Sequence, residues 1–565
     1  MQHPASRSHR TASPKLPARG RSALALALAG ALAPACGAAP TGAPSTAAPS
    51  RSLQAPAANA GLPSRDAAAV TAGLPSPSPS TDALIATAPP PAVPALSAAS
   101  QVPSAASQAA RGARVNLEDP APGAAVRLTA VHGFVNIALL PQRGAATIGM
   151  IRAGQSVRLR EPAPVRGPGV GPCAGGWYAV APRGYVCAGA DAVISAADDL
   201  VAAAAAEALP DPSGVLPFRV GVSTGTPLYL RVPTPDEQRS HEPDLDRHLA
   251  SLPPPDDLGV VDARPAGQGP SPAIARLLGQ KGRPLVAERE AYPGMKLAWA
   301  REFDAEGRTW LLTADLQLVP KDRVRVRATP ELSIVDLRAE EGAALPLAFL
   351  WTGEAARIRR DEHGKFVETG ETWARQAFVP VTGRTVRTRQ GMLLQTRDGD
   401  YLRQERATVI RTRDRRPPGV GPKDKWVLVR VTHGYLVAYE GDKPVLASAM
   451  SPGADGVGRR GYTTPPGLYT VYAKAVSWDM AGVERGEPWK VDEVPWVAFF
   501  KDNYALHAAW WHDDFGRPRS HGCVNLPPAA AKALFGWLDP ALPEGWYSVS
   551  AYYPQVKGTV IEVRP

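Results

Sequence analysis

Cysteine is scarce in this chain, with four among 565 residues. Cys173 and Cys187 flank the short stretch AGGWYAVAPRGYV, and this spacing suits a disulfide. Cys36 lies at the end of an N-terminal leader, which leaves Cys523 without a partner. A leftover cysteine in an exported protein is a liability or a working thiol, so Cys523 is the first candidate for chemistry.

Long apolar runs are also missing. The run SALALALAGALAPA, residues 22–35, would span only about 21 Å as a helix, too little for a bilayer core of roughly 30 Å. Basic residues precede it, so we expect a signal peptide over residues 1–36 and an oxidising compartment. The ending APAC resembles a bacterial lipobox and predicts lipidation of Cys36. The alternative is ordinary cleavage near Ala35, with Cys36 incidental.

A large charge of one sign is the third absence. The formal net charge is +10, and residues 1–35 carry five basic and no acidic side chains, which leaves about +5 after cleavage. No basic patch stands out, so nucleic acid is a poor candidate partner. We expect a protein of the cell envelope, on the periplasmic side, anchored to the membrane through Cys36. The charge fits an anionic envelope polymer without deciding for one.

The composition divides the rest of the chain. Residues 37–120 are rich in Ala, Pro and Ser, which predicts a disordered tether. Residues 121–198 hold short strand-like runs, and GWYAVAPRGYVCA resembles bacterial SH3-like modules, either wall-binding or a spacer. Residues 216–415 predict one or two further β modules, with a long loop or an insertion from 240 to 282. We expect a multi-domain, mainly β protein with few helices.

Residues 421–565 predict a β-rich C-terminal domain that contains one helix and a hairpin turn at YEGDKP. Cys523 lies there, two residues after His521, which shares its face in an extended chain. His507 ends the strand-like run NYALH and is a second base for the thiol. Gly522 permits a close turn, and we expect Cys523 at a strand-to-helix turn, where the helix dipole would favour a thiolate.

These residues form a motif. His507 is followed after sixteen positions by Cys523, within Ser520-His521-Gly522-Cys523-Val524-Asn525. The pattern resembles the L,D-transpeptidase catalytic domain of YkuD type. Thr464-Pro465-Pro466-Gly467 and Ser451-Pro452-Gly453 resemble two further steps of that family. One departure is Ala508, where many members have glycine after the histidine.

The resemblance implies a peptidoglycan substrate and no cofactor or metal. Cys523 would form a thioester with a tetrapeptide stem, release D-Ala and pass the acyl group to an amine, giving a 3→3 cross-link or a protein attachment. It implies that His507 transfers the proton and that His521, with the Gly522 and Cys523 backbone, lines the oxyanion region. The expected substrate-binding residues are Ser520, Gly522, Asn525, Arg519, His512 and Trp510.

Other interpretations stay open at this point. Within the same chemistry, an L,D-carboxypeptidase differs only in its acceptor. A wall-binding lipoprotein with an inactive domain, or an inert buried Cys523, belongs to a different class. His507, His512, His521 and Cys523 also have the types of a zinc set. Papain-like and NlpC-type peptidases place the cysteine before the histidine, which is the opposite order to this chain.

Overall fold

The computed structural model describes residues 126–194, 200–252, 269–279, 284–338, 344–413, 415–454, 462–484, 487–551 and 556–565. All of these residues belong to one unit of the chain. The expected signal peptide, Cys36 and the tether therefore lie outside the described residues. Within these ranges, no helix combines the length and apolarity that crossing a bilayer requires.

The first module, residues 126–194, is built from seven short strands. They are β1 (Arg127–Ala130), β2 (Phe134–Ala138), β3 (Thr147–Arg152), β4 (Ser156–Arg158), β5 (Trp177–Ala179), β6 (Tyr185–Cys187) and β7 (Ala192–Ile194). One sheet has the order β4-β1-β7, and β3-β2-β6-β5 is a second run. Alternate residues such as Leu128, Ile137, Ile151 and Val186 form its core. Such alternation is the mark of strands with one buried face.

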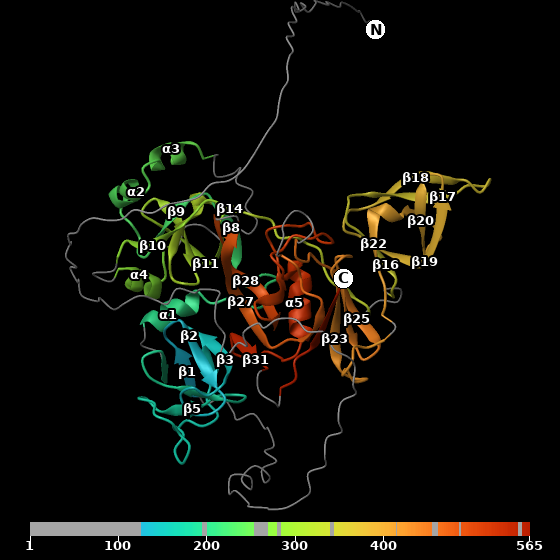
Figure 1. The fold of residues 1–565 in the computed structure, drawn as a ribbon. Coiled ribbons are helices and arrows are strands. Elements are labelled where there is room, and N and C mark those ends of the chain that lie inside the picture. The colour runs from blue at the N-terminus through green and yellow to red at the C-terminus, as the bar shows by residue number, and fades with distance from the viewer. Residues whose placement is uncertain are drawn as a thin grey trace, which may run out of the picture. The chain divides into compact units, whose positions relative to one another are not determined.

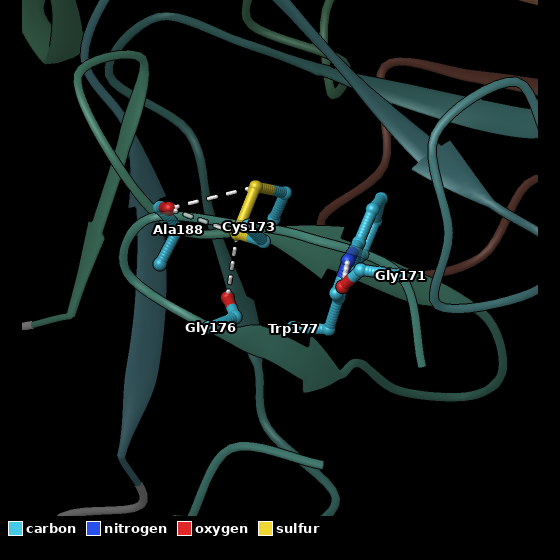
Figure 2. The surroundings of a disulfide bond; sticks show 6 residues. Gly171, Cys173, Gly176, Trp177 and Ala188 are labelled. Carbon is cyan, nitrogen blue, oxygen red and sulfur yellow. Dashed lines mark hydrogen bonds between the residues drawn. A yellow bond between two sulfur atoms is a disulfide. The ribbon is translucent and has the colours of Figure 1, made fainter. Parts of the chain in front are cut away.

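Cys173 and Cys187 form a disulfide in this module. Figure 2 shows the bridge beside Trp177, whose indole N–H donates to the Gly171 carbonyl at 3.1 Å. The bond joins β6 to the loop that leads into β5, so the loop and the strand pair are held together.

The second module, residues 200–326, contains helices as well as strands. The helices are α1 (Leu200–Glu207), α2 (Pro235–His241), α3 (Leu245–Ala250) and α4 (Pro272–Leu278); the strands are β8 (Arg219–Ser223), β9 (Thr226–Tyr229), β10 (Val286–Ala291), β11 (Lys296–Ala305), β12 (Arg308–Thr313), β13 (Leu318–Pro320) and β14 (Val324–Val326). The stretch from 240 to 282 was expected to be a long loop or an insertion, and its described parts contain α3 and α4, so they are not a simple loop. Thr234 and Ser271 cap two of the short helices, each followed by proline, which stabilises a first turn.

The third module, residues 344–413, is a seven-stranded sheet, coloured yellow to orange in Figure 1. Its strands are β16 (Leu347–Leu350), β17 (Ala355–Arg360), β18 (Phe366–Trp373), β19 (Phe378–Thr388), β20 (Gly391–Thr396), β21 (Tyr401–Arg403) and β22 (Ala407–Ile410). Leu350, Val381, Leu394 and Leu402 pack in its interior.

The C-terminal domain begins with a six-stranded sheet of order β15-β25-β24-β23-β32-β26. Its strands are β15 (Val335–Asp336), β23 (Lys425–Arg430), β24 (Tyr435–Glu440), β25 (Lys443–Ala449), β26 (Gly467–Thr470) and β32 (Val560–Arg564). The hairpin predicted at YEGDKP is confirmed, since Glu440 pairs with Lys443 across the turn.

The remaining strands of this domain carry the candidate site. They are β27 (Ala473–Glu484), β28 (Glu487–Lys501), β29 (Tyr504–Ala508), β30 (Val524–Leu526) and β31 (Ser548–Ser550). Helix α5 (Pro528–Trp537) packs on β28 and β29 and appears in red in Figure 1. Its Leu534 and Phe535 share a core with Val427 and Leu436 of the six-stranded sheet. The predicted fold class, mainly β with several sheets, is confirmed.

Candidate active site

Two short parallel strands bring the motif together. In β29 and β30, Leu506 pairs with Val524 and His507 with Asn525. Leu506 and Val524 point into the apolar core under α5. Successive side chains alternate between faces, so His507 and Asn525 lie on the opposite face, and Cys523 follows the same alternation. A diagonal pair in a sheet is separated by about 7–8 Å, which the imidazole and the thiol can span.

The turn before Cys523 is fixed by buried hydroxyl groups. Ser520 Oγ donates to the Cys523 carbonyl and accepts from the Gly522 N–H at 3.1 Å. Thr464 Oγ1 donates to the Gly522 carbonyl at 2.8 Å and accepts from the Gly453 N–H at 2.8 Å. Thr464 and Gly453 lie in the two further segments that resemble the family, so these segments hold the cysteine turn in place.

Gly522 is required by this turn for two reasons. Its φ is +127°, which L side chains rarely adopt. A Cβ at this position would also lie 2.5 Å from the Tyr504 ring. The backbone can therefore pass close to Tyr504 only with glycine here.

Cys523 is a free, half-buried thiol. Its Sγ lies 3.6 Å from the Asn503 carbonyl oxygen. Burial raises the pKa of the thiol to about 11, although the Ala505 backbone N–H opposes that rise. The expected strand-to-helix turn is wrong, because β30 and Pro527 separate Cys523 from the first turn of α5. The helix dipole acts within about one turn, so it does not lower this pKa.

His507 is buried and neutral. Its side chain has 2% exposure, and burial lowers its pKa to about 4. Nδ1 lies 2.9 Å from the Ala508 carbonyl, which only accepts, so Nδ1 carries the proton and Nε2 keeps a free lone pair. The ring stacks on Trp511 with centroids 5.9 Å apart. Among the described residues, no hydrogen bond joins His507 to the Cys523 thiol.

His521 lies against the β27–β28 hairpin. Its Nε2 is 2.9 Å from Glu484 Oε2, and its ring stacks on Trp489 at 4.5 Å and meets Tyr462 edge-on at 4.7 Å. The Gly522 N–H donates to Ser520 Oγ, so it is not free to serve an oxyanion in this structure. The Gly522 and Cys523 backbone was expected to line the oxyanion region. The Ser520 hydroxyl binds the Gly522 N–H but not the Cys523 N–H.

His512 and Asn525 form a second pair of contacting side chains. The Asp514 N–H donates to His512 Nδ1 at 3.3 Å, and His512 Nε2 is 3.0 Å from the Asn525 amide. Burial lowers the pKa of His512 to about 4, so the ring is neutral with its proton on Nε2. The Asn525 amide oxygen is the matching acceptor once the amide is oriented toward that proton, and this orientation gives the buried Asn525 Oδ1 a partner.

Trp510 and Arg519, two of the expected substrate-binding residues, have different surroundings. Trp510 has 1% exposure and packs in a core with Phe218, Val220 and Ala298, so the indole beside His507 is that of Trp511. Arg519 forms an ion pair with Asp514, with half of its side chain exposed.

Glu484 and Trp489 lie far from the motif in the chain, so its spacing did not predict their contact with His521. The long alternating run around them predicts a hairpin. It does not predict that the hairpin contacts His521.

The ligand types of the zinc alternative are not gathered in one place. Within the described ranges, no group of three or more His, Cys, Asp or Glu side chains lies close enough to hold a metal ion. His507 faces Trp511, whereas His521 faces Glu484 and Trp489.

The C-terminal domain matches a known family. Residues 424–563 match the model of the YkuD L,D-transpeptidase catalytic domain, and this segment is therefore assigned to that type. No curated protein matched the chain.

Solved structures also resemble parts of the chain. The catalytic domain of the Enterococcus faecium L,D-transpeptidase, solved by NMR, is 22% identical, with 25% of this chain and 98% of that chain covered and a TM-score of 0.20. An L,D-transpeptidase from Xylanimonas cellulosilytica is 24% identical over 26% of this chain and 64% of that chain, with a TM-score of 0.18. The L,D-transpeptidase from Mycobacterium smegmatis is 17% identical over 43% of this chain and 89% of that chain, with a TM-score of 0.20.

Proposed function

We propose that this protein is a peptidoglycan L,D-transpeptidase of the cell envelope. The observation that carries the proposal is the pairing of β29 with β30, which puts the Cys523 thiol and the buried His507 on one face within the family match. The substrate would be a tetrapeptide stem that ends in D-Ala.

The resting pair is a neutral thiol and a neutral imidazole. As Cys523 Sγ attacks the carbonyl carbon before the terminal D-Ala, His507 Nε2 takes the thiol proton. The same proton then goes to the nitrogen of D-Ala as the peptide bond breaks, and a thioester remains. The amine of a second stem attacks the thioester and gives a proton to His507, which returns it to the departing sulfur.

The site's other side chains support these steps. Ser520 and Thr464 hold the turn so that the thiol keeps its direction. Trp511 covers one face of His507, and this excludes water from the base. The Cys523 N–H is the backbone donor we propose for the developing oxyanion.

Mass spectrometry on the full chain with a purified disaccharide-tetrapeptide tests the proposal. Loss of D-Ala with a cross-linked dimer is the expected result, and Cys523→Ala should abolish both. Loss of D-Ala without dimer would overturn the transfer step in favour of a carboxypeptidase. No product, together with no acylation by a carbapenem, would overturn the enzymatic proposal.

We also propose the envelope location and the anchor. They rest on the basic and apolar leader and on APAC at residues 33–36. In a bacterial host, the wild-type protein should partition with membranes and Cys36→Ser should not. A Cys36→Ser protein that stays with membranes would contradict the anchor.

A further inference from the structure

The segment from Ala509 to Arg519 connects the strand of His507 to the turn of Cys523. One side of it packs on the third module. Phe515 is 1% exposed and shares a core with Leu347 and Phe349 of β16. The Arg517 guanidinium lies 4.2 Å from the centroid of the Trp351 ring. A core side chain and a cation–π contact together bind the segment to this module.

Polar bonds reinforce this attachment at Asp513. Arg375 donates through Nη1 to the Asp513 carboxylate at 2.7 Å and through Nη2 to the Asp513 carbonyl at 2.9 Å. Gln376 Nε2 donates to the same carbonyl at 2.6 Å. The Arg375 contact holds the pKa of the Asp513 carboxyl below its usual range. Three donors from one turn of the third module thus converge on one residue.

The other side of the segment reaches the catalytic strands. His512, next to Asp513, contacts the Asn525 amide at 3.0 Å, and Asn525 pairs with His507 across the two strands. The Ser451 hydroxyl donates to the Asp514 carbonyl at 3.1 Å. This bond ties the segment to Ser451-Pro452-Gly453, whose Gly453 N–H donates to Thr464 at the cysteine turn. A shift of Asp513 would therefore be passed to His512 and Asn525.

We infer that the third module is a positioning element of the active site, and that Arg375 and Gln376 act through Asp513 to hold His512 and Asn525 beside His507 and Cys523. The inference rests on the proposed function for its catalytic consequence. Neither residue touches the reacting atoms. A displacement of about 1 Å at a catalytic group can lower a rate by up to about 10²-fold. Loss of the Arg375 and Gln376 bonds to Asp513 should therefore lower turnover.

The test compares the full chain with Arg375→Ala/Gln376→Ala. Arg387→Ala, at an exposed site of β19 in the same module, is the matched control. The double variant should lower kcat for D-Ala release by about 10- to 10²-fold with little change in KM. Carbapenem acylation should slow equally, whereas iodoacetamide alkylation, which needs the thiolate and not a positioned base, should keep its rate. Arg375→Lys, with Gln376 left as in the wild type, should restore part of the kcat that the double variant loses.

Hydrogen exchange gives a readout that does not depend on activity. Amides of residues 511–526 should exchange faster in the double variant and at the wild-type rate in Arg387→Ala. Unchanged exchange would overturn the inference, even if the wild-type chain had no transpeptidase activity. An unchanged kcat in an active protein would overturn the inference too. Equal decreases in the rates of acylation and alkylation would also overturn it, because they indicate general disorder of the site.

Discussion

Burial shifts the pKa values of the two side chains of the proposed catalytic pair in opposite directions. It raises the pKa of the Cys523 thiol to about 11 and lowers that of the His507 imidazole to about 4. Both groups are therefore neutral between these values, and no thiolate–imidazolium pair is stored before substrate arrives. The proposed reaction then depends on proton transfer during the attack, which makes the position of His507 Nε2 more important than its basicity.

The thiol's reactivity tests this description directly. In a Cys36→Ser background, the rate of Cys523 alkylation by iodoacetamide should rise about tenfold per pH unit from pH 7 to pH 10, because the thiolate fraction grows until the pH reaches the pKa. Cys523→Ser provides the blank. A rate that is already level below pH 7 would mean that a stored ion pair exists and that this account of the site is wrong.

Backbone conformation supplies a second residue-scale prediction. Gly522→Ala should lower the free energy of unfolding by at least about 1–3 kcal/mol, since it forces a strained φ and a contact with the Tyr504 ring. Gly536→Ala is the control, because Gly536 lies within α5 with open space around it and should gain about 0.5–1 kcal/mol. Urea unfolding measures the free energy of both variants. Equal free energies of unfolding for Gly522→Ala and Gly536→Ala would contradict the requirement for glycine at position 522.

Among the secondary-structure elements, the β27–β28 hairpin determines where His521 points. Glu484 and Trp489 lie on opposite strands of the hairpin and hold the ring by a hydrogen bond and a stack. The spacing of the motif would allow His521 to turn toward Cys523. The hairpin decides otherwise, because it offers the imidazole a carboxylate and an aromatic face at once.

Removing the carboxylate should free His521. Glu484→Ala should lower kcat by roughly tenfold, while the unfolding free energy changes by at most about 1 kcal/mol, since the pair is partly exposed. Glu487→Ala, an exposed residue on the same hairpin, should leave both unchanged. If Glu484→Ala has full kcat, the orientation of His521 does not matter for turnover.

Three parts of the molecule meet at Arg152. From β3 of the first module, its guanidinium donates to Glu493 of β28 at 2.7 Å and to Asp315 of the second module at 3.2 Å. Ser477 and the Tyr547 hydroxyl bond the same Glu493 carboxylate at 2.7 Å and 2.9 Å. A buried, hydrogen-bonded charge network of this kind favours one arrangement of its partners, because each unpaired charge would be costly.

Breaking the network should therefore be expensive. Arg152→Ala should destabilise the chain by about 3–5 kcal/mol, since Glu493 would keep a buried charge without its main partner. Arg158→Ala, an exposed arginine of the neighbouring β4, should change stability by less than about 0.5 kcal/mol. Scanning calorimetry measures both, and Arg152→Met with Glu493→Gln should recover part of the loss. A wild-type melting temperature in Arg152→Ala would contradict a structural role.

The sequence by itself determined the fold class and the identity of the motif. Strand periodicity needs only local alternation, and the YEGDKP hairpin needs only a two-residue turn, so both could be predicted. The spacing of His507, Ser520, His521 and Cys523 likewise pointed to a segment that lies within the family match.

The tertiary structure decided which side chains meet. Trp510 and Trp511 are adjacent and chemically alike, yet packing buries the first in a core and stacks the second on His507. The short strand β30 moved Cys523 away from the helix dipole, and Glu484 and Arg375 reach the site from distant segments. Such contacts depend on how separate elements pack, and no local pattern in the chain encodes them. Burial depends on the same packing, so the pKa values of Cys523 and His507 could not be read from the sequence either.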